Sequence, residues 1–218
     1  MKYLKMLGLA AVAATALMAL AGVGTAAAAG GVLCEEIVEP CEEKNQWLVN
    51  AHMTFALKAG TKAKLTTTGG ATVLECGKSG LTGKVLSAGT KAENAKVEVK
   101  KEWLTWEECS HPFSTATPGE LEFEYRKEPE TKGTVFAKGF VFTGEILGLH
   151  CSYKIGANPD IGLYTPGAAG KDGIIAVSTT LEKENSAAHP SLGLCPAKLV
   201  FHAEYTLTTN TALYIKGE

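Results

Sequence analysis

The sequence predicts an all-β protein, an antiparallel β-sandwich with a β-barrel as the alternative architecture, braced by disulfide bonds. Short runs rich in Thr and Val recur along the chain and are separated by glycine pairs, which is a strand-and-hairpin pattern. No segment shows a convincing amphipathic helical period. Six cysteines follow what reads as an export leader, and this combination is typical of exported domains stapled by disulfides.

The first 29 residues have the three-part layout of a signal peptide. Lys2 and Lys5 precede an apolar run over 7–23, and small residues over 25–30 fit a cleavage site. An uncleaved anchor is the alternative, but the run is short for a membrane span and ends in the cleavage pattern. We therefore expect a protein that is secreted or held at the cell surface, with no membrane span after cleavage.

The cysteines are expected to form three disulfides. An even number in an exported chain favours this interpretation, although the sequence leaves the pairing open. Sequential pairing is expected, because each bridge then closes a local loop, and local loops are the easiest to form. It joins Cys34 to Cys41, Cys76 to Cys109 and Cys151 to Cys195. Zinc and redox chemistry are disfavoured, because neither a ligand-like Cys/His spacing nor a Cys-x-x-Cys motif occurs.

Downstream of the leader, we expect an acidic N-terminal arm or cap over 30–50 and one all-β domain over 51–218. The first half of the domain predicts strands through Thr-rich or β-branched runs, with turns at Gly60 and Gly69–Gly70. In the second half, Glu120–Arg126 alternates apolar and charged residues most clearly. The expected strands lie over 52–58, 62–68, 72–76, 79–86, 96–100, 120–126, 134–142, 145–154, 173–180, 197–208 and 212–215. Loops are expected over 128–133, 158–173 and 185–196, where Pro, Gly and Asn gather.

The charge balance argues against nucleic acid as a partner. Removing Lys2 and Lys5 from the 21 basic residues leaves 19 against 23 acidic ones, a net charge of about −4. The basic residues are scattered, and Arg126 is the only arginine. A nucleic-acid or phosphate site requires a basic stripe and often recruits Arg.

No residue of the sequence falls in a recognised catalytic, metal-binding or cofactor-binding motif. Gly-x-Ser-x-Gly is absent, and Asp160 and Asp172 are the only aspartates. The glutamates of 120–124 share one strand face, which is the pattern of a solvated surface. The five histidines do not fall at metal-ligand spacing.

Two tryptophans are the candidate binding residues. Trp103 and Trp106 lie close together, and flat aromatic rings stack on sugars or apolar ligands. Packing in or beside the core is the competing interpretation and the preferred one. A glycan or another extracellular protein is the expected kind of partner, reached through these rings or the turn-rich loop.

Three short motifs resemble those of a group of exported bacterial β-proteins that contain disulfides and have no assigned activity. They are Leu74–Cys76, Gly148–Tyr153 and Ala203–Thr208. The resemblance implies an exported all-β domain with paired cysteines and carries no site residues. We therefore expect a non-catalytic extracellular module, structural, adhesive or binding. A secreted hydrolase of unrecognised type, or a carrier of a small apolar ligand inside a barrel, are the alternatives.

Overall fold

The computed structural model describes residues 30–37, 40–126, 132–156, 159–186 and 193–217. These ranges contain fifteen strands and three short 3₁₀ helices. The strands are β1 (Val32–Cys34), β2 (His52–Leu57), β3 (Ala63–Thr67), β4 (Thr72–Ser87), β5 (Ala95–Val99), β6 (Leu104–Cys109), β7 (Phe113–Thr117), β8 (Gly119–Tyr125), β9 (Gly133–Lys138), β10 (Val141–Ile146), β11 (Leu149–Ile155), β12 (Asp160–Thr165), β13 (Ile174–Lys183), β14 (Lys198–Leu207) and β15 (Tyr214–Lys216). The helices are η1 (Glu43–Asn45), η2 (Lys101–Trp103) and η3 (Ala168–Gly170).

Eight strands close into an antiparallel barrel, in the order β2, β4, β5, β8, β9, β12, β13 and β14. The closure depends on β13 and β14, which pair from Ile174–Thr206 to Glu182–Lys198. Of the two architectures that the sequence left open, the barrel is therefore the one observed. A sandwich has two sheets with free edges, whereas here the ends of one sheet join.

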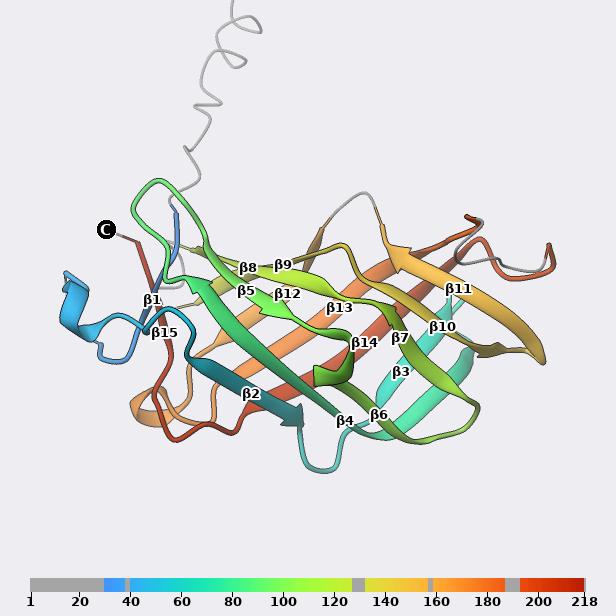
Figure 1. The fold of residues 1–218 in the computed structure, drawn as a ribbon. Helices are drawn as coiled ribbons and strands as arrows, with labels where there is room; N and C mark the ends of the chain where they lie inside the picture. Colours follow the sequence, from blue (N-terminus) through green and yellow to red (C-terminus); the bar gives the residue numbers. More distant parts are fainter. Residues whose placement is uncertain (1–29, 38–39, 127–131, 157–158, 187–192, 218) are drawn as a thin grey trace, which may run out of the picture.

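Three long strands extend beyond the barrel and carry a second group of strands. β4 pairs with β2 and β5 in its second half, and with β3 and β6 in its first half. β13 likewise pairs with β12 at one end and with β11 at the other, and β10 and β7 follow β11. In Figure 1 this second strand group lies to the right of the barrel. It consists of β3, β6, β7, β10 and β11 together with the ends of β4, β13 and β14.

The predicted N-terminal arm packs against the end of the barrel. β1 pairs with β15 at that end, and Val32 and Leu33 are fully buried. Trp47 is also buried, and its Nε1–H donates to the Ala212 carbonyl oxygen at 2.9 Å. The acidic side chains of Glu36, Glu42 and Glu43 are exposed. The arm is thus a cap with a buried inner side and an acidic outer side.

The disulfides have the sequential pairing that the sequence predicts: Cys34–Cys41, Cys76–Cys109 and Cys151–Cys195. Cys76 and Cys109 are direct partners in the ladder between β4 and β6. The bridge Cys151–Cys195 joins β11 to the segment that leads into β14. Three disulfides are consistent with an oxidising environment. None of the helices in the described ranges is long and apolar enough to cross a membrane.

Several strand predictions differ from the structure. The runs 72–76 and 79–86 form one continuous strand, β4. The glycines of β4 keep an extended backbone at positions where neighbouring side chains come close. A Cβ atom on Gly83 would lie 2.3 Å from Val97 Cγ1. Strands β1, β6 and β7 were not predicted, and β12 lies inside the expected loop 158–173. Much of the expected loops 128–133 and 185–196 lies outside the described residues.

A candidate apolar binding site

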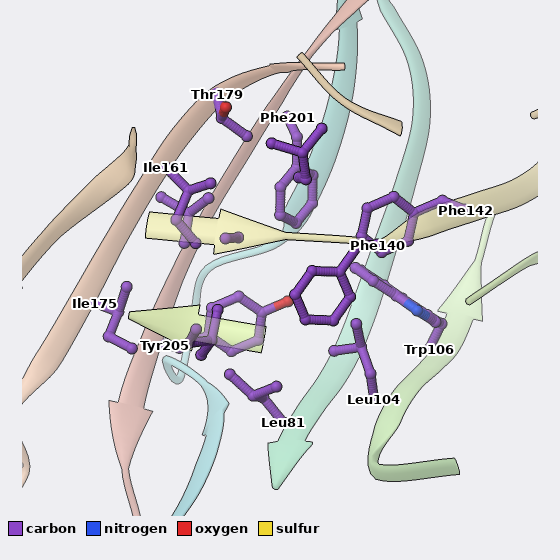
Figure 2. A pocket seen from close by; sticks show the side chains of 14 residues that line it. Leu81, Leu104, Trp106, Phe140, Phe142, Ile161, Ile175, Thr179, Phe201 and Tyr205 are labelled. Atoms are coloured by element: carbon purple, nitrogen blue, oxygen red, sulfur yellow. The ribbon is translucent and has the colours of Figure 1, made fainter. Parts of the chain in front are cut away.

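An apolar cavity of about 60 Å³ lies where the barrel meets the second strand group. Its walls are almost entirely hydrocarbon, and five of its lining residues are aromatic (Figure 2). The lining residues are Leu81, Leu104, Trp106, Leu121, Ala137, Phe140, Phe142, Ile155, Ile161, Ile175, Val177, Thr179, Phe201 and Tyr205.

The strand alternation explains why these side chains point inward. In β8, Leu121 and Phe123 are buried, while Glu120, Glu122 and Glu124, which alternate with them, are partly exposed. In β13, Ile175 and Val177 are buried on the same inner face. On the other side of the cavity, Leu104 and Trp106 alternate with the exposed Thr105. The cavity therefore lies between inner faces supplied by both strand groups.

The cavity has few polar atoms in its lining, and one of them already has a hydrogen-bond partner. The Tyr205 hydroxyl lies 2.9 Å from Ser79 Oγ, and both residues are buried. Burial raises the pKa of Tyr205 to about 12, so its phenol is neutral at physiological pH. Thr179 contributes the other hydroxyl of the lining. A molecule inside would meet carbon on nearly every side.

The cavity is large enough for a guest and too apolar to hold water well. One water needs roughly 10–15 Å³ of such space and also two or more polar partners. Cavities lined by Leu, Ile and Phe stay dry and accept small apolar molecules. Chemically, the site suits a small apolar guest.

Trp106 is one of the half-buried lining residues that lie between the cavity and the surface. It is half-buried, and its Nε1–H donates to Thr115 Oγ1 on β7 at 3.1 Å. Its indole ring meets Phe113, Phe142 and Phe201 edge-on, with centroid distances of 4.8, 6.0 and 5.8 Å. The ring is thus held by one hydrogen bond and three aromatic contacts.

Trp103, the other candidate binding residue, belongs to a different environment. It ends η2, is half-buried, and packs on the edge of the core. The His52 ring lies 5.2 Å away edge-on, and Lys100 Nζ lies 4.8 Å from the ring centroid. The structure does not bring the two tryptophans into one site.

A polar groove on the outer face of β7, β10 and β11 contains Ser114, Thr143, Glu145 and His150. A serine nucleophile needs a base within hydrogen-bond reach. Ser114 Oγ instead lies 3.1 Å from Thr143 Oγ1. Glu145 and His150 are cross-strand partners on the exposed face. The groove offers hydroxyls and a His/Glu pair without the geometry of a catalytic triad.

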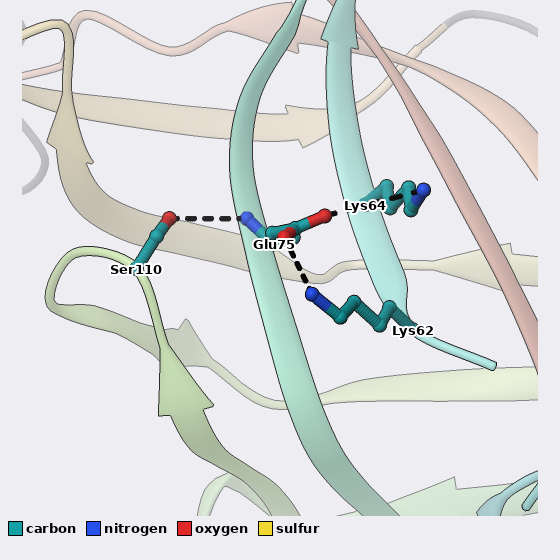
Figure 3. A network of polar contacts seen from close by, with 4 residues as sticks. All are labelled: Lys62, Lys64, Glu75 and Ser110. Atoms are coloured by element: carbon teal, nitrogen blue, oxygen red, sulfur yellow. Dashed lines mark hydrogen bonds and ion pairs between the residues drawn. The ribbon is translucent and has the colours of Figure 1, made fainter. Parts of the chain in front are cut away.

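The described residues include no group of three or more His, Cys, Asp or Glu side chains that could hold a metal ion. Many of their charged side chains form surface ion pairs, of which Glu75 is an example (Figure 3). Its carboxylate lies 2.6 Å from Lys62 Nζ and 4.0 Å from Lys64 Nζ, and its backbone N–H donates to Ser110 Oγ. The hydrogen bond from Lys62 lowers the pKa of Glu75. This network joins β3, β4 and the β6–β7 connection.

Comparison with protein-family models, curated proteins and solved structures finds no match for this chain. Sequence reasoning identified Trp106 but missed the rest of the lining. The alternation marked many of these residues as inward-facing, yet a residual void depends on how side chains from distant strands fit together.

Proposed function

We propose that this chain is an exported, non-catalytic binding protein whose cavity takes up a small apolar molecule or the apolar end of a larger one. The observation that carries the proposal is the cavity itself, about 60 Å³ in volume and lined by hydrocarbon. An unfilled cavity costs roughly 24 cal/mol per Å³, or about 1.4 kcal/mol here. A guest of matching size recovers part of that free energy.

The hydrogen-bonded barrel beside the cavity supports the same proposal. The cavity lies beside a closed barrel whose neighbouring strands are hydrogen-bonded all the way round. A preformed apolar site needs little ordering on binding, so more of the contact energy appears as affinity.

Xenon and benzene are suitable probes, because both are apolar and small. Their binding can be followed by NMR through the indole N–H signal of Trp106, which lines the cavity. We expect saturable shifts of this signal and smaller effects on the signal of Trp103. Xenon tests the cavity at its present size, and benzene tests whether the walls can yield.

A cavity-filling variant provides the control. Ala137 is buried and lines the cavity, so Ala137→Val should weaken xenon binding several-fold. Ala176 lies exposed on the outer face of β13, and Ala176→Val should leave binding unchanged. If the wild-type protein shows no saturable response to either probe, the proposed function is wrong.

A second candidate function is contact with another extracellular protein. Leu48, Val49 and Leu86 are exposed at the barrel end that carries the N-terminal cap. The hydrogen bond from Asn50 N–H to the Val85 carbonyl places the 48–50 turn beside β4. Contiguous exposed apolar groups favour protein contacts. Leu48→Lys should release the protein from the surface of the producing cell if this end is the contact. Unchanged surface retention would count against this candidate.

A glycan partner has less support from the contacts of Trp103. Stacking on a sugar needs an open ring face, and Lys100 already covers one face of this ring. Trp103→Ala should therefore lower stability without abolishing binding to a glycan array.

A further inference from the structure

The partly exposed side chains of the cavity wall all belong to the second strand group. Ten of the lining residues are buried. The other four are half-buried and belong to β6, β11 and β14: Leu104, Trp106, Ile155 and Phe201. The cavity therefore approaches solvent through the second strand group, whereas the closed barrel seals its other side.

The second strand group has a seam between β6 and β7. β6 pairs with β4 from Cys76–Cys109 to Leu81–Leu104, and β7 pairs with β10. Although β6 and β7 follow each other in the chain and lie close together, no ladder joins them in the described part of the sheet. The wall of the second group is therefore held by side chains at this seam, where it could open without breaking a ladder.

Trp106 closes the seam directly in front of the cavity. Its hydrogen bond to Thr115 crosses from β6 to β7, and Phe113 on β7 meets the indole edge-on. The far end of the seam is fixed, because Cys109 is bridged to Cys76 and the Ser110 N–H donates to the Glu75 carbonyl. Movement is therefore easiest at the Trp106–Thr115 end.

We propose that the β6–β7 seam is the entrance to the cavity and that Trp106 is its gate, an inference that rests on the proposed function. The hydrogen bond to Thr115 holds the indole across the entrance. Breaking it lets the ring swing towards solvent, while β6 stays attached to β4. The aromatic rings beside the entrance favour flat or slender apolar groups without charge.

The kinetics of benzene exchange test the gate. Thr115→Val keeps the shape of the buried side chain and removes the acceptor for the indole N–H. A neutral hydrogen bond contributes enough to change a rate by about fivefold. We expect NMR line-shape analysis to show association and dissociation both about fivefold faster, with the dissociation constant changed less than the rates. Thr105→Val is the matched control, because Thr105 lies on β6 with its side chain exposed.

The outcomes separate the gate from the function. Faster exchange in Thr115→Val, and not in Thr105→Val, supports the gate. Benzene binding with wild-type exchange rates in Thr115→Val overturns the gate and leaves the proposed function standing. Absence of binding of both xenon and benzene in the wild-type protein removes both, whereas xenon binding without benzene binding overturns the gate alone. If Thr115→Val does not fold, Trp106→Phe also removes the hydrogen bond and must show the same acceleration, or the gate is wrong.

Discussion

Removing the disulfides one pair at a time should rank them by the length of chain that each one closes. The sequence separations are 7 residues for Cys34–Cys41 and 44 for Cys151–Cys195. In the chain-entropy account, the shorter loop contributes about 2 kcal/mol to the free energy of unfolding and the longer loop about 4 kcal/mol. We therefore expect Cys151→Ala/Cys195→Ala to lose about 1.5–2 kcal/mol more than Cys34→Ala/Cys41→Ala.

These two pairs form a matched comparison, because all four cysteines are buried. The loss of buried sulfur is then similar in both double variants, and the difference isolates the loop length. Urea unfolding followed by far-ultraviolet circular dichroism gives the free energy of unfolding and its denaturant slope. If the Cys34/Cys41 variant loses as much stability as the Cys151/Cys195 variant at an unchanged slope, the reasoning from loop length is refuted.

Three further changes test the packing. Burial raises the pKa of Tyr153 and of Tyr205 to about 12, whereas the same phenols titrate near pH 10 in the unfolded chain, so the free energy of unfolding should be unchanged below pH 10 and fall between pH 10 and 12. Phenolate absorbance measured alongside circular dichroism checks this. Titration of both phenols near pH 10 without unfolding would contradict it. Ser79→Ala should cost about 1–3 kcal/mol in urea unfolding, because the Tyr205 hydroxyl loses its buried partner; a loss below 0.5 kcal/mol would show that another group replaces it. Gly89→Ala should destabilise more than Gly60→Ala in thermal unfolding, since both have positive φ but only at Gly89 would a Cβ atom meet backbone, at 1.9 Å; equal losses would contradict the steric argument.

The sequence was sufficient for the features that local patterns encode. Alternation identified the strand over 197–208, observed as β14, and the spacing of the cysteines identified all three bridges. The glycines of β4 led the sequence analysis to divide this strand in two. Gly83 instead lies within the strand, where Val97 leaves no room for a Cβ atom. The sequence favoured a sandwich and kept the observed barrel as the alternative, because the choice depends on the long-range pairing of β13 with β14.

The candidate site was less predictable, because it too depends on contacts between strands that are far apart in the sequence. The sequence singled out Trp106 by its residue type, without indicating what the ring would face. Phe142 and Phe201 meet this ring from β10 and β14, elements that are distant from it in the chain. A cavity is what remains after such contacts are made, so no single strand carries a signal for it.

The placement of the disulfides follows from the same division into two strand groups. The barrel is closed by hydrogen-bonded ladders and needs no covalent closure. The second strand group is open at the β6–β7 seam, and two of the three bridges lie within this strand group. Cys76–Cys109 fixes β6 to β4, and Cys151–Cys195 fixes β11 to the start of β14. Each contributes about 4 kcal/mol in the chain-entropy account, which exceeds the cost of about 1.4 kcal/mol for the cavity. Two covalent bridges within the second strand group thus offset the cost of an unpaired seam and an unfilled cavity.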